Sequence, residues 1–137
     1  MAVDLTLRAA AIMRRPVVAA TDTTTARDVA IELLMGEFTG LPVAEPDGTI
    51  VGIVTELDLL KALRLGKPLE TTMATDIMSQ GVVTVDVDTP VERVMEMFEA
   101  LDIIRVPVTD KDGALVGIIS RTDILKALIR PKFMYFA

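Results

Sequence analysis

Two short segments of the sequence carry the residue types best suited to binding a phosphorylated ligand. In each segment a hydroxyl residue is followed three positions later by an aspartate: Thr55 and Asp58 in one, Ser120 and Asp123 in the other. Each segment stands where a buried strand should pass into a helix, and a helix N-terminus offers unpaired N–H groups to a phosphate. An aspartate one turn later can accept hydrogen bonds from both hydroxyls of a ribose. Together these features indicate a nucleotide.

The hydroxyl–aspartate pairs, and two arginines near the first expected strand, also have purely structural interpretations. A threonine or serine followed three residues later by an acid is a capping box, which stabilises a helix start by roughly 1 kcal/mol without any further role. Arg14 and Arg15, which precede the first expected strand, could reach a bound phosphate or could simply be solvated on a loop. The sequence leaves these alternatives open.

Arginines distinguish the two segments from each other. Arg121 within the second segment, and Arg105 in the strand region before it, can offer bidentate donors to a phosphate. The matching positions near the first segment are Glu56 and Gly40, so a carboxylate stands where a phosphate would bind. We therefore expect a charged nucleotide at Asp123.

The composition excludes most catalytic chemistry. The 137 residues include no His and no Cys, which removes the commonest general base, the commonest transition-metal ligands and every thiol nucleophile. We therefore expect a binding protein and no enzyme, with no catalytic residues, no metal site and no required cofactor.

Charge and hydropathy limit the partners. A formal net charge of −6 opposes broad contact with nucleic acid, which needs clustered Lys and Arg. The apolar runs are far shorter than the roughly 20 residues that span a bilayer, and the N-terminus does not resemble a signal peptide. We expect a cytoplasmic protein with no nucleic-acid or membrane partner.

The sequence also matches itself in one gapless register. Residues 12–63 align with residues 77–128, and roughly a third of the positions are identical. The shared motifs are Ile12-Met13 with Ile77-Met78, Pro42-Val43 with Pro107-Val108, Asp47-Gly48 with Asp112-Gly113, and Val51-Gly52-Ile53 with Val116-Gly117-Ile118. The chain therefore contains two tandem copies of one structural unit.

Each copy has the pattern of a β-α-β-β-α unit. In the second copy we expect a strand at 82–85, a helix capped by Thr89 with Pro90 as its first residue, strands at 106–108 and 115–119 around an Asp-Gly turn, and a helix from Ser120 to about Ile129. In the first copy we expect the same order, with Thr24 capping the first helix, a strand at 50–54 and a helix from Thr55 to about Leu65.

The chain is divided accordingly. We expect the first repeat with an N-terminal helix at 1–65, a linker at 66–76, the second repeat at 77–130 and an aromatic tail at 131–137. Each repeat has a small sheet with helices on one side, so an α+β fold in which the sheets pack together about a pseudo-twofold axis would bury both sheets and leave paired clefts. The tail could fold over its own core or dock on another subunit.

In these motifs and their order the chain resembles the paired cystathionine-β-synthase (CBS) domains, also called Bateman modules. The resemblance covers residues 12–63 and 77–128. It implies a flattened pair of repeats that commonly dimerises and that binds AMP, ADP, ATP or S-adenosylmethionine in its inter-repeat clefts.

The resemblance also implies site residues. Asp58 and Asp123 would bind ribose, Thr55 and Ser120 would bind phosphate, and Thr84 would add a polar contact. Apolar residues would enclose the adenine, although ordinary core packing is an alternative role for them. These are Val17, Val18, Leu41, Pro42 and Val43 in the first copy, and Val82, Val83, Val106, Pro107 and Val108 in the second.

We therefore expect a stand-alone regulatory module, a homodimer, that senses energy or metabolite state through an adenine nucleotide and acts on an unidentified protein partner. Two alternatives remain. One is a structural or dimerisation module whose clefts have lost their ligands, which Glu56 favours for at least one site. The other is a sensor of S-adenosylmethionine.

Overall fold

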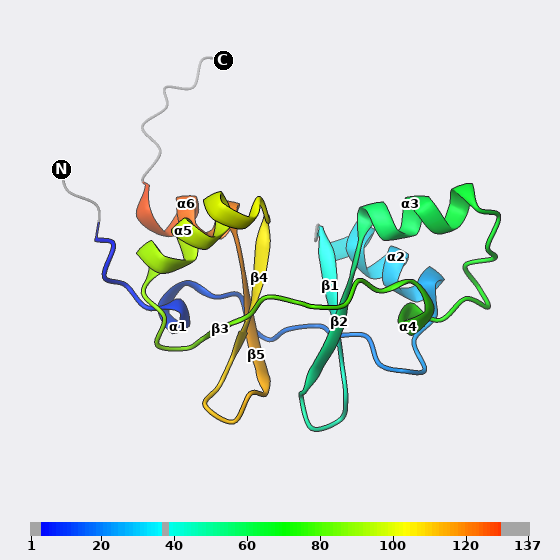
Figure 1. Ribbon diagram of the computed structural model, residues 1–137, viewed down its shortest axis with the longest axis horizontal. Coiled ribbons are helices and arrows are strands. Elements are labelled where there is room, and N and C mark those ends of the chain that lie inside the picture. Colours follow the sequence, from blue (N-terminus) through cyan, green and yellow to red (C-terminus); the bar gives the residue numbers. More distant parts are fainter. Residues whose placement is uncertain (1–3, 37–38, 130–137) are drawn as a thin grey trace, which may run out of the picture.

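The computed structural model describes residues 4–36 and 39–129, and it is an α+β fold of two similar halves (Figure 1). In each half two helices pack on a small sheet, and the sheets lie toward the centre of the molecule. The first half contains α2 (Ala26–Gly36), β1 (Gly40–Ala44), β2 (Ile50–Thr55) and α3 (Glu56–Arg64). The second half contains β3 (Val85–Asp86), α5 (Val91–Leu101), β4 (Arg105–Thr109), β5 (Leu115–Ser120) and α6 (Arg121–Leu128).

The two β-hairpins have equivalent registers, which confirms the internal duplication. β1 pairs antiparallel with β2 from Gly40 opposite Thr55, and β4 pairs with β5 from Arg105 opposite Ser120. Both hairpins are irregular at the equivalent step of the ladder. The glycine of each Asp-Gly turn adopts a positive φ, which a residue without a Cβ tolerates.

The opening strand of each repeat is shorter than expected. Instead of residues 82–85, the two-residue strand β3 pairs parallel with β4. In the first repeat, residues 17–18 form no strand, and this segment contributes one isolated bridge between Ala20 and Val43. Residues 83–84 are exposed. No buried sheet face therefore holds them in register.

Helices α2 and α5 begin later than the predicted caps Thr24 and Thr89. The hydroxyls of these two threonines accept hydrogen bonds from the backbone N–H three residues earlier, at 2.9 and 3.2 Å. They therefore stabilise the turn that precedes each helix. The hydroxyl of Thr25 accepts from the Asp28 N–H at 3.1 Å at the start of α2, and Pro90 is the N-cap of α5.

Each half is completed by a short helix that precedes the other half in the sequence, α1 (Ala9–Ile12) or α4 (Ala74–Ile77) (Figure 1). Ala9 is buried in the core of the second half, and its N–H donates to the Thr89 carbonyl at 2.8 Å. Ala74 is buried in the core of the first half, and its N–H donates to the Thr24 carbonyl at 2.9 Å. The N-terminal helix, grouped with the first repeat in the sequence, therefore packs on the second, and the segment expected to be a linker contains the start of α4.

The two remaining predictions concern membranes and the C-terminal tail. Across residues 4–36 and 39–129, no helix has the length and apolar character needed to cross a membrane. The aromatic tail at 131–137 lies outside the described residues.

Glycines in β2 and β5 leave room for the segment that crosses each sheet. A Cβ at Gly52 would lie 2.5 Å from Met78 Sδ and 2.9 Å from the Ser79 carbonyl oxygen. We expect Gly52→Ala to lower the free energy of unfolding by about 1–3 kcal/mol, because a backbone group would have to move. Gly117→Ala is the matched control, since the three nearest neighbours of its Cβ are side-chain atoms of Met13. Urea denaturation should show the smaller loss for Gly117→Ala, and equal losses would contradict this explanation.

Candidate functional site

Both predicted hydroxyl–aspartate pairs form capping boxes. Thr55 and Ser120 are the N-caps of α3 and α6, and their side chains accept from the backbone N–H of Asp58 at 3.2 Å and of Asp123 at 3.1 Å. In return, each aspartate accepts from the backbone N–H of its N-cap residue, at 2.9 Å in α3 and 2.8 Å in α6. The capping interpretation is therefore correct for both pairs, and any ligand has to use the remaining capacity of each carboxylate.

The Asp58 carboxylate has further partners within the chain. Ser79 Oγ lies 3.1 Å from Oδ1 and 3.2 Å from Oδ2, and Thr55 Oγ1 donates to Oδ2 at 3.0 Å. Ser79 follows α4 and is held against β2 by a bridge to Ile53. The Asp58 carboxylate therefore already accepts from two hydroxyls of its own chain, with which the hydroxyls of a ribose would have to compete.

The residue equivalent to Ser79 in the other half is Arg14, and it makes the surroundings of Asp123 different. Arg14 bridges to Ile118 as Ser79 bridges to Ile53. Its Nε lies 4.0 Å from Asp123 Oδ1, which is longer than a hydrogen bond. The side chain of Asp123 is 10% exposed. Asp123 therefore has the Arg14 side chain beside it, where Asp58 has the hydroxyl of Ser79.

A cleft of about 290 Å³ between the two halves contains Asp123. Its walls are the start of α6, the start of β4, the residues at the start of β1, and Arg14. Three cations, Arg14, Arg105 and Lys126, line the cleft together with one carboxylate, that of Asp123. The cleft is therefore suited to an anionic group.

An apolar hollow of about 140 Å³ adjoins this cleft and shares Arg14, Gly40 and Ile118 with it. Its other lining residues come from the first repeat: Arg15, Pro16, Val17, Val18, Leu41 and Pro42. We call the cleft and the hollow together the composite cleft. It reaches the size range of small-molecule sites, about 300–1,000 Å³. The structure thus brings the predicted residues Val18, Leu41 and Pro42 of the first repeat to Ser120, Asp123 and Arg105 of the second.

Arg105 extends from the second half to the first. Its Nε donates to Thr39 Oγ1 at 2.8 Å, and its side chain lies against Gly40, where a Cβ would be 3.0 Å away. Burial lowers the pKa of Arg105 below its usual value, and the negative charges of Glu56 and Asp58 act in the opposite direction. Because a guanidinium remains charged at neutral pH, Arg105 places a positive charge at the border of the two halves.

Contrary to expectation, Arg121 does not line the composite cleft. Its Nε donates to the Ile103 carbonyl at 2.9 Å, and its Nη2 lies 3.4 Å from Asp102 Oδ1. The side chain therefore points toward α5. The reason is helix geometry, since residues two positions apart, such as Arg121 and Asp123, lie on different faces of a helix.

The apolar residues predicted from the second repeat also lie elsewhere. Val106 and Pro107 are fully buried, which agrees with core packing. Val83 is 37% exposed, and Thr84 lines a different hollow beside the two hairpins. Asp58 and Thr55 lie at the start of α3, away from the lining of the composite cleft. Within the described part of the chain, the composite cleft is therefore built by residues of both repeats.

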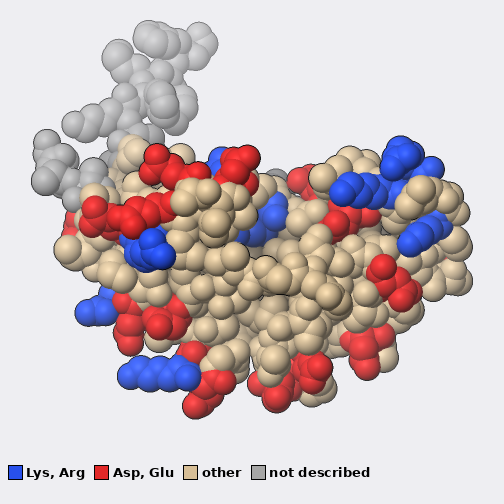
Figure 2. Space-filling view, viewed as in Figure 1, with Lys and Arg blue, Asp and Glu red and all other residues tan. Residues whose placement is uncertain are grey.

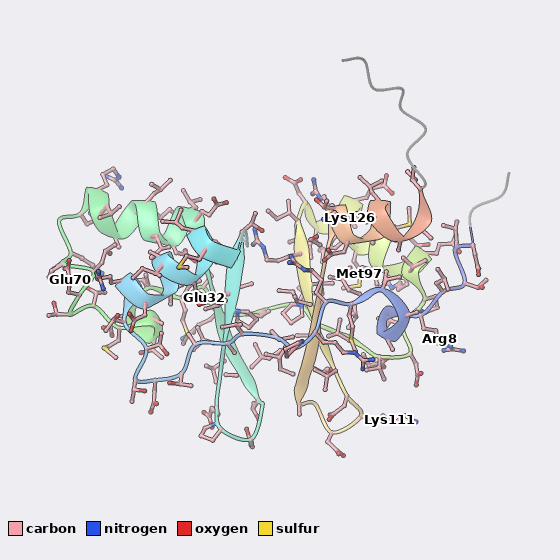
Figure 3. The ribbon with its side chains drawn as sticks, turned by 180° about the vertical axis from the view of Figure 1, so that it is seen from behind. Arg8, Glu32, Glu70, Met97, Lys111 and Lys126 are labelled. Carbon is pink, nitrogen blue, oxygen red and sulfur yellow. The ribbon has the colours of Figure 1, made fainter. Side chains whose placement is uncertain are left out.

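Sequence reasoning missed three polar residues of the cleft, Thr39, Thr122 and Lys126. Lys126 extends from α6 (Figure 3) and follows Asp123 by one helical turn. Because residues one helical turn apart share a face of the helix, this spacing could have predicted that Lys126 lies on the same side of the helix as Asp123. Thr39 gives no local signal, because its position depends on its contact with Arg105 from the other half.

The family model described as the CBS domain matches residues 9–65 and again residues 74–130. The chain belongs to the CBS domain family. A curated relative, the uncharacterised protein MK0525 of Methanopyrus kandleri, is 33% identical over 116 residues, which are 84% of this chain and 59% of the relative. The chain spans 18% to 59% of the length of three curated relatives that it matches.

Two solved structures of CBS proteins with adenosine derivatives are similar to this chain. The CBS domain pair of protein MJ0100, in complex with 5-methylthioadenosine and S-adenosyl-L-methionine, has a TM-score of 0.78 at 29% identity and covers 88% of this chain and 98% of that one. CBSX2 in complex with AMP has a TM-score of 0.76 at 28% identity and covers 88% of this chain and 94% of that one. These similarities confirm the tandem CBS fold that the sequence predicted.

Proposed function

We propose that the composite cleft binds an adenine nucleotide, AMP, ADP or ATP, and that the chain acts through it as a regulatory sensor of energy or metabolite state. The observation that carries this proposal is the composition of the cleft. An apolar hollow adjoins a partly buried aspartate and three cations. The chemical groups of a nucleotide follow in the same order: a flat base, a ribose with two hydroxyls, and a phosphate.

The assignment of residues follows from their position. The hollow around Val18 and Pro42 takes the adenine, and the Asp123 carboxylate accepts hydrogen bonds from the ribose. Arg105 and Lys126, with the N-terminus of α6 at Ser120, hold the phosphate. The AMP complex of CBSX2 and the S-adenosylmethionine complex of MJ0100 support a ligand of this class.

The charge of the cleft favours a nucleotide over S-adenosylmethionine. S-adenosylmethionine carries a positive sulfonium beside its ribose, where a phosphate would carry negative charge. Arg14, Arg105 and Lys126 would repel the sulfonium and attract the phosphate. The identity of the nucleotide then depends on how many phosphates these three cations contact.

The proposed regulation depends on the fact that both repeats contribute residues to the cleft. The ligand contacts Leu41 and Pro42 of the first repeat and Asp123 of the second, so it stabilises one arrangement of the two repeats. We propose that a cytoplasmic homodimer communicates this arrangement to a protein partner.

The second candidate is a structural module whose clefts are empty. The hydrogen bonds from Ser79 and Thr55 to Asp58 favour it for the first repeat, because a ribose would have to compete with these hydroxyls for the carboxylate. The proposed function therefore has one ligand for each chain, at Asp123.

Calorimetric titration tests both candidates. We expect one equivalent of AMP, ADP or ATP to bind each chain, and S-adenosylmethionine to bind at least about 10-fold more weakly, a difference of 1.4 kcal/mol. Two equivalents would show that a second ligand binds at Asp58 in spite of its hydrogen bonds to Ser79 and Thr55. A preference for S-adenosylmethionine would contradict the charge argument, and the lack of heat with all four compounds would favour the structural module.

A further inference from the structure

A groove of about 550 Å³ lies on the outer surface of the second half, between α5 and α6, and it shares no lining residue with the composite cleft. Phe98 and Ile124 are buried beneath it, whereas Met95 and Leu125 are 37% and 56% exposed in its lining. We call this hollow the α5–α6 groove. Exposed apolar side chains that are grouped around a hollow indicate an interaction site.

The α5–α6 groove carries an excess of negative charge. Glu99 and Asp102 belong to its lining, and Figure 2 shows acidic side chains gathered on this part of the surface, above α5. The Asp102 carboxylate is already paired, since its Oδ1 lies 3.4 Å from Arg121 Nη2. Glu99 has no ion-pair partner among the residues that the structure describes. An apolar occupant that also carries a positive charge would therefore suit the groove.

A segment of this kind follows α6 in the sequence. The aromatic tail, residues 131–137, lies outside the described residues, so its composition is the evidence. It contains Phe133, Tyr135 and Phe136, which are three of the chain's five aromatic residues. It also carries Lys132 and no acidic side chain. Aromatic rings bury a large apolar area. The tail therefore combines the apolar surface and the positive charge that would suit the α5–α6 groove.

The end of α6 allows the tail to return to the groove. Ile129, the C-cap of α6, has extended backbone angles of φ −121° and ψ 129°, and Pro131 disfavours any continuation of the helix. An extended chain advances at most about 3.6 Å per residue, so Phe133 and Phe136 can lie up to about 14 and 25 Å from Ile129. Leu125 lies about 6 Å back along the axis of α6. The aromatic residues can therefore reach the groove of their own chain.

We propose that the aromatic tail folds back along its own α6 and places its aromatic side chains in the α5–α6 groove, with Lys132 beside Glu99. The attachment to α6 keeps the tail at an effective concentration in the millimolar range, whereas a second copy or another protein is present only at its concentration in solution. The tail is therefore favoured over other occupants. The proposal uses no residue of the composite cleft and is independent of nucleotide binding.

The fluorescence of Tyr135 tests whether the tail is docked. The chain contains no Trp and a single Tyr, so its tyrosine emission reports the tail alone. We expect acrylamide to quench Tyr135 about 5- to 10-fold less in the native chain than in the chain unfolded in urea, because a docked state favoured about tenfold leaves the ring free for about a tenth of the time. Similar quenching of the native and the unfolded chain would overturn the proposal.

Leu125→Glu tests the groove, with Leu60→Glu as the matched control. Leu60 is the counterpart of Leu125 on α3 and has a similar exposure of 60%. We expect Leu125→Glu to raise the quenching of Tyr135 nearly to that of the unfolded chain, and Leu60→Glu to leave the quenching unchanged. Circular dichroism should show that both variants fold, because both leucines are exposed. Equal effects of the two variants on Tyr135 would refute the α5–α6 groove as the docking site.

Charge reversal and dilution test the partner of the tail. Glu99→Lys and Lys132→Glu should each raise the quenching of Tyr135 by about 2-fold or more, in keeping with one exposed ion pair. The double variant should restore the protection, because the pair is then present with its signs exchanged. An unrestored double variant would refute the contact of Lys132 with Glu99. Dilution should leave the protection unchanged, and its loss on dilution would show docking on a second copy and overturn docking within the chain.

Discussion

Asp123→Ala should weaken the binding of AMP by at least about 100-fold. The Asp123 carboxylate is the single acid among the described lining residues of the composite cleft, and its Oδ1 lies 4.0 Å from Arg14 Nε. Two hydrogen bonds from ribose hydroxyls to a charged acceptor are each worth about 1.5–3 kcal/mol. Their loss together corresponds to the expected change in the dissociation constant. Calorimetric titration with AMP measures it.

Asp58→Ala is the matched control for this variant. Both substitutions remove the carboxylate that accepts from an N-cap N–H, from Thr55 in one case and Ser120 in the other. Each should therefore cost about 1 kcal/mol of stability, which urea denaturation can verify. Asp58→Ala should bind AMP as the unaltered chain does. Tight binding by Asp123→Ala, or an equal loss in Asp58→Ala, would refute the assignment of ribose to Asp123.

Arg105→Ala should weaken the binding of AMP by about 10- to 100-fold and leave the binding of adenosine nearly unchanged. Arg105 lines the cleft and is held by its hydrogen bond to Thr39. One charge-assisted hydrogen bond to a phosphate contributes about 1.5–3 kcal/mol, and adenosine has no phosphate to lose it. Comparing the two ligands by calorimetry therefore separates a phosphate contact from a general disturbance of the cleft.

Arg121→Ala is the control for Arg105→Ala. Arg121 is the neighbouring arginine that the sequence also assigned to phosphate, but its side chain bonds to Ile103 and Asp102 near α5. Its removal should change the affinities for AMP and adenosine less than about 2-fold. If Arg121→Ala lost AMP binding as strongly as Arg105→Ala, the phosphate would lie toward α5, and the composite cleft would be assigned wrongly.

Much of the fold could be predicted from local patterns. The Asp-Gly turns, the strands around them and the hydroxyl–aspartate helix starts depend on residues close together in the sequence. All of these formed as expected. The predicted caps Thr24 and Thr89 were wrong by one residue, because their hydroxyls stabilise the preceding turn instead. Such errors arise where two local hydrogen-bond patterns compete over the same few residues.

The candidate site could be predicted only in part. The residues Asp123, Ser120 and Arg105 were expected to act together, and they line one cleft. Their apolar neighbours came from the first repeat, as Val18 and Pro42, and not from Val106 and Pro107 beside them in the sequence. A sequence does not show which of two equivalent apolar segments lies next to a given helix start.

By itself, the sequence determined that one unit occurs twice, that each copy forms a hairpin followed by a capped helix, and that catalysis with His or Cys is excluded. Only the tertiary structure decided that α1 packs on the second half and α4 on the first. That exchange places Arg14 beside Asp123 and Ser79 beside Asp58. Two helix starts with the same capping box thereby acquire different surroundings, because each is completed by a segment distant from it in the sequence, and such contacts form only when the whole chain packs.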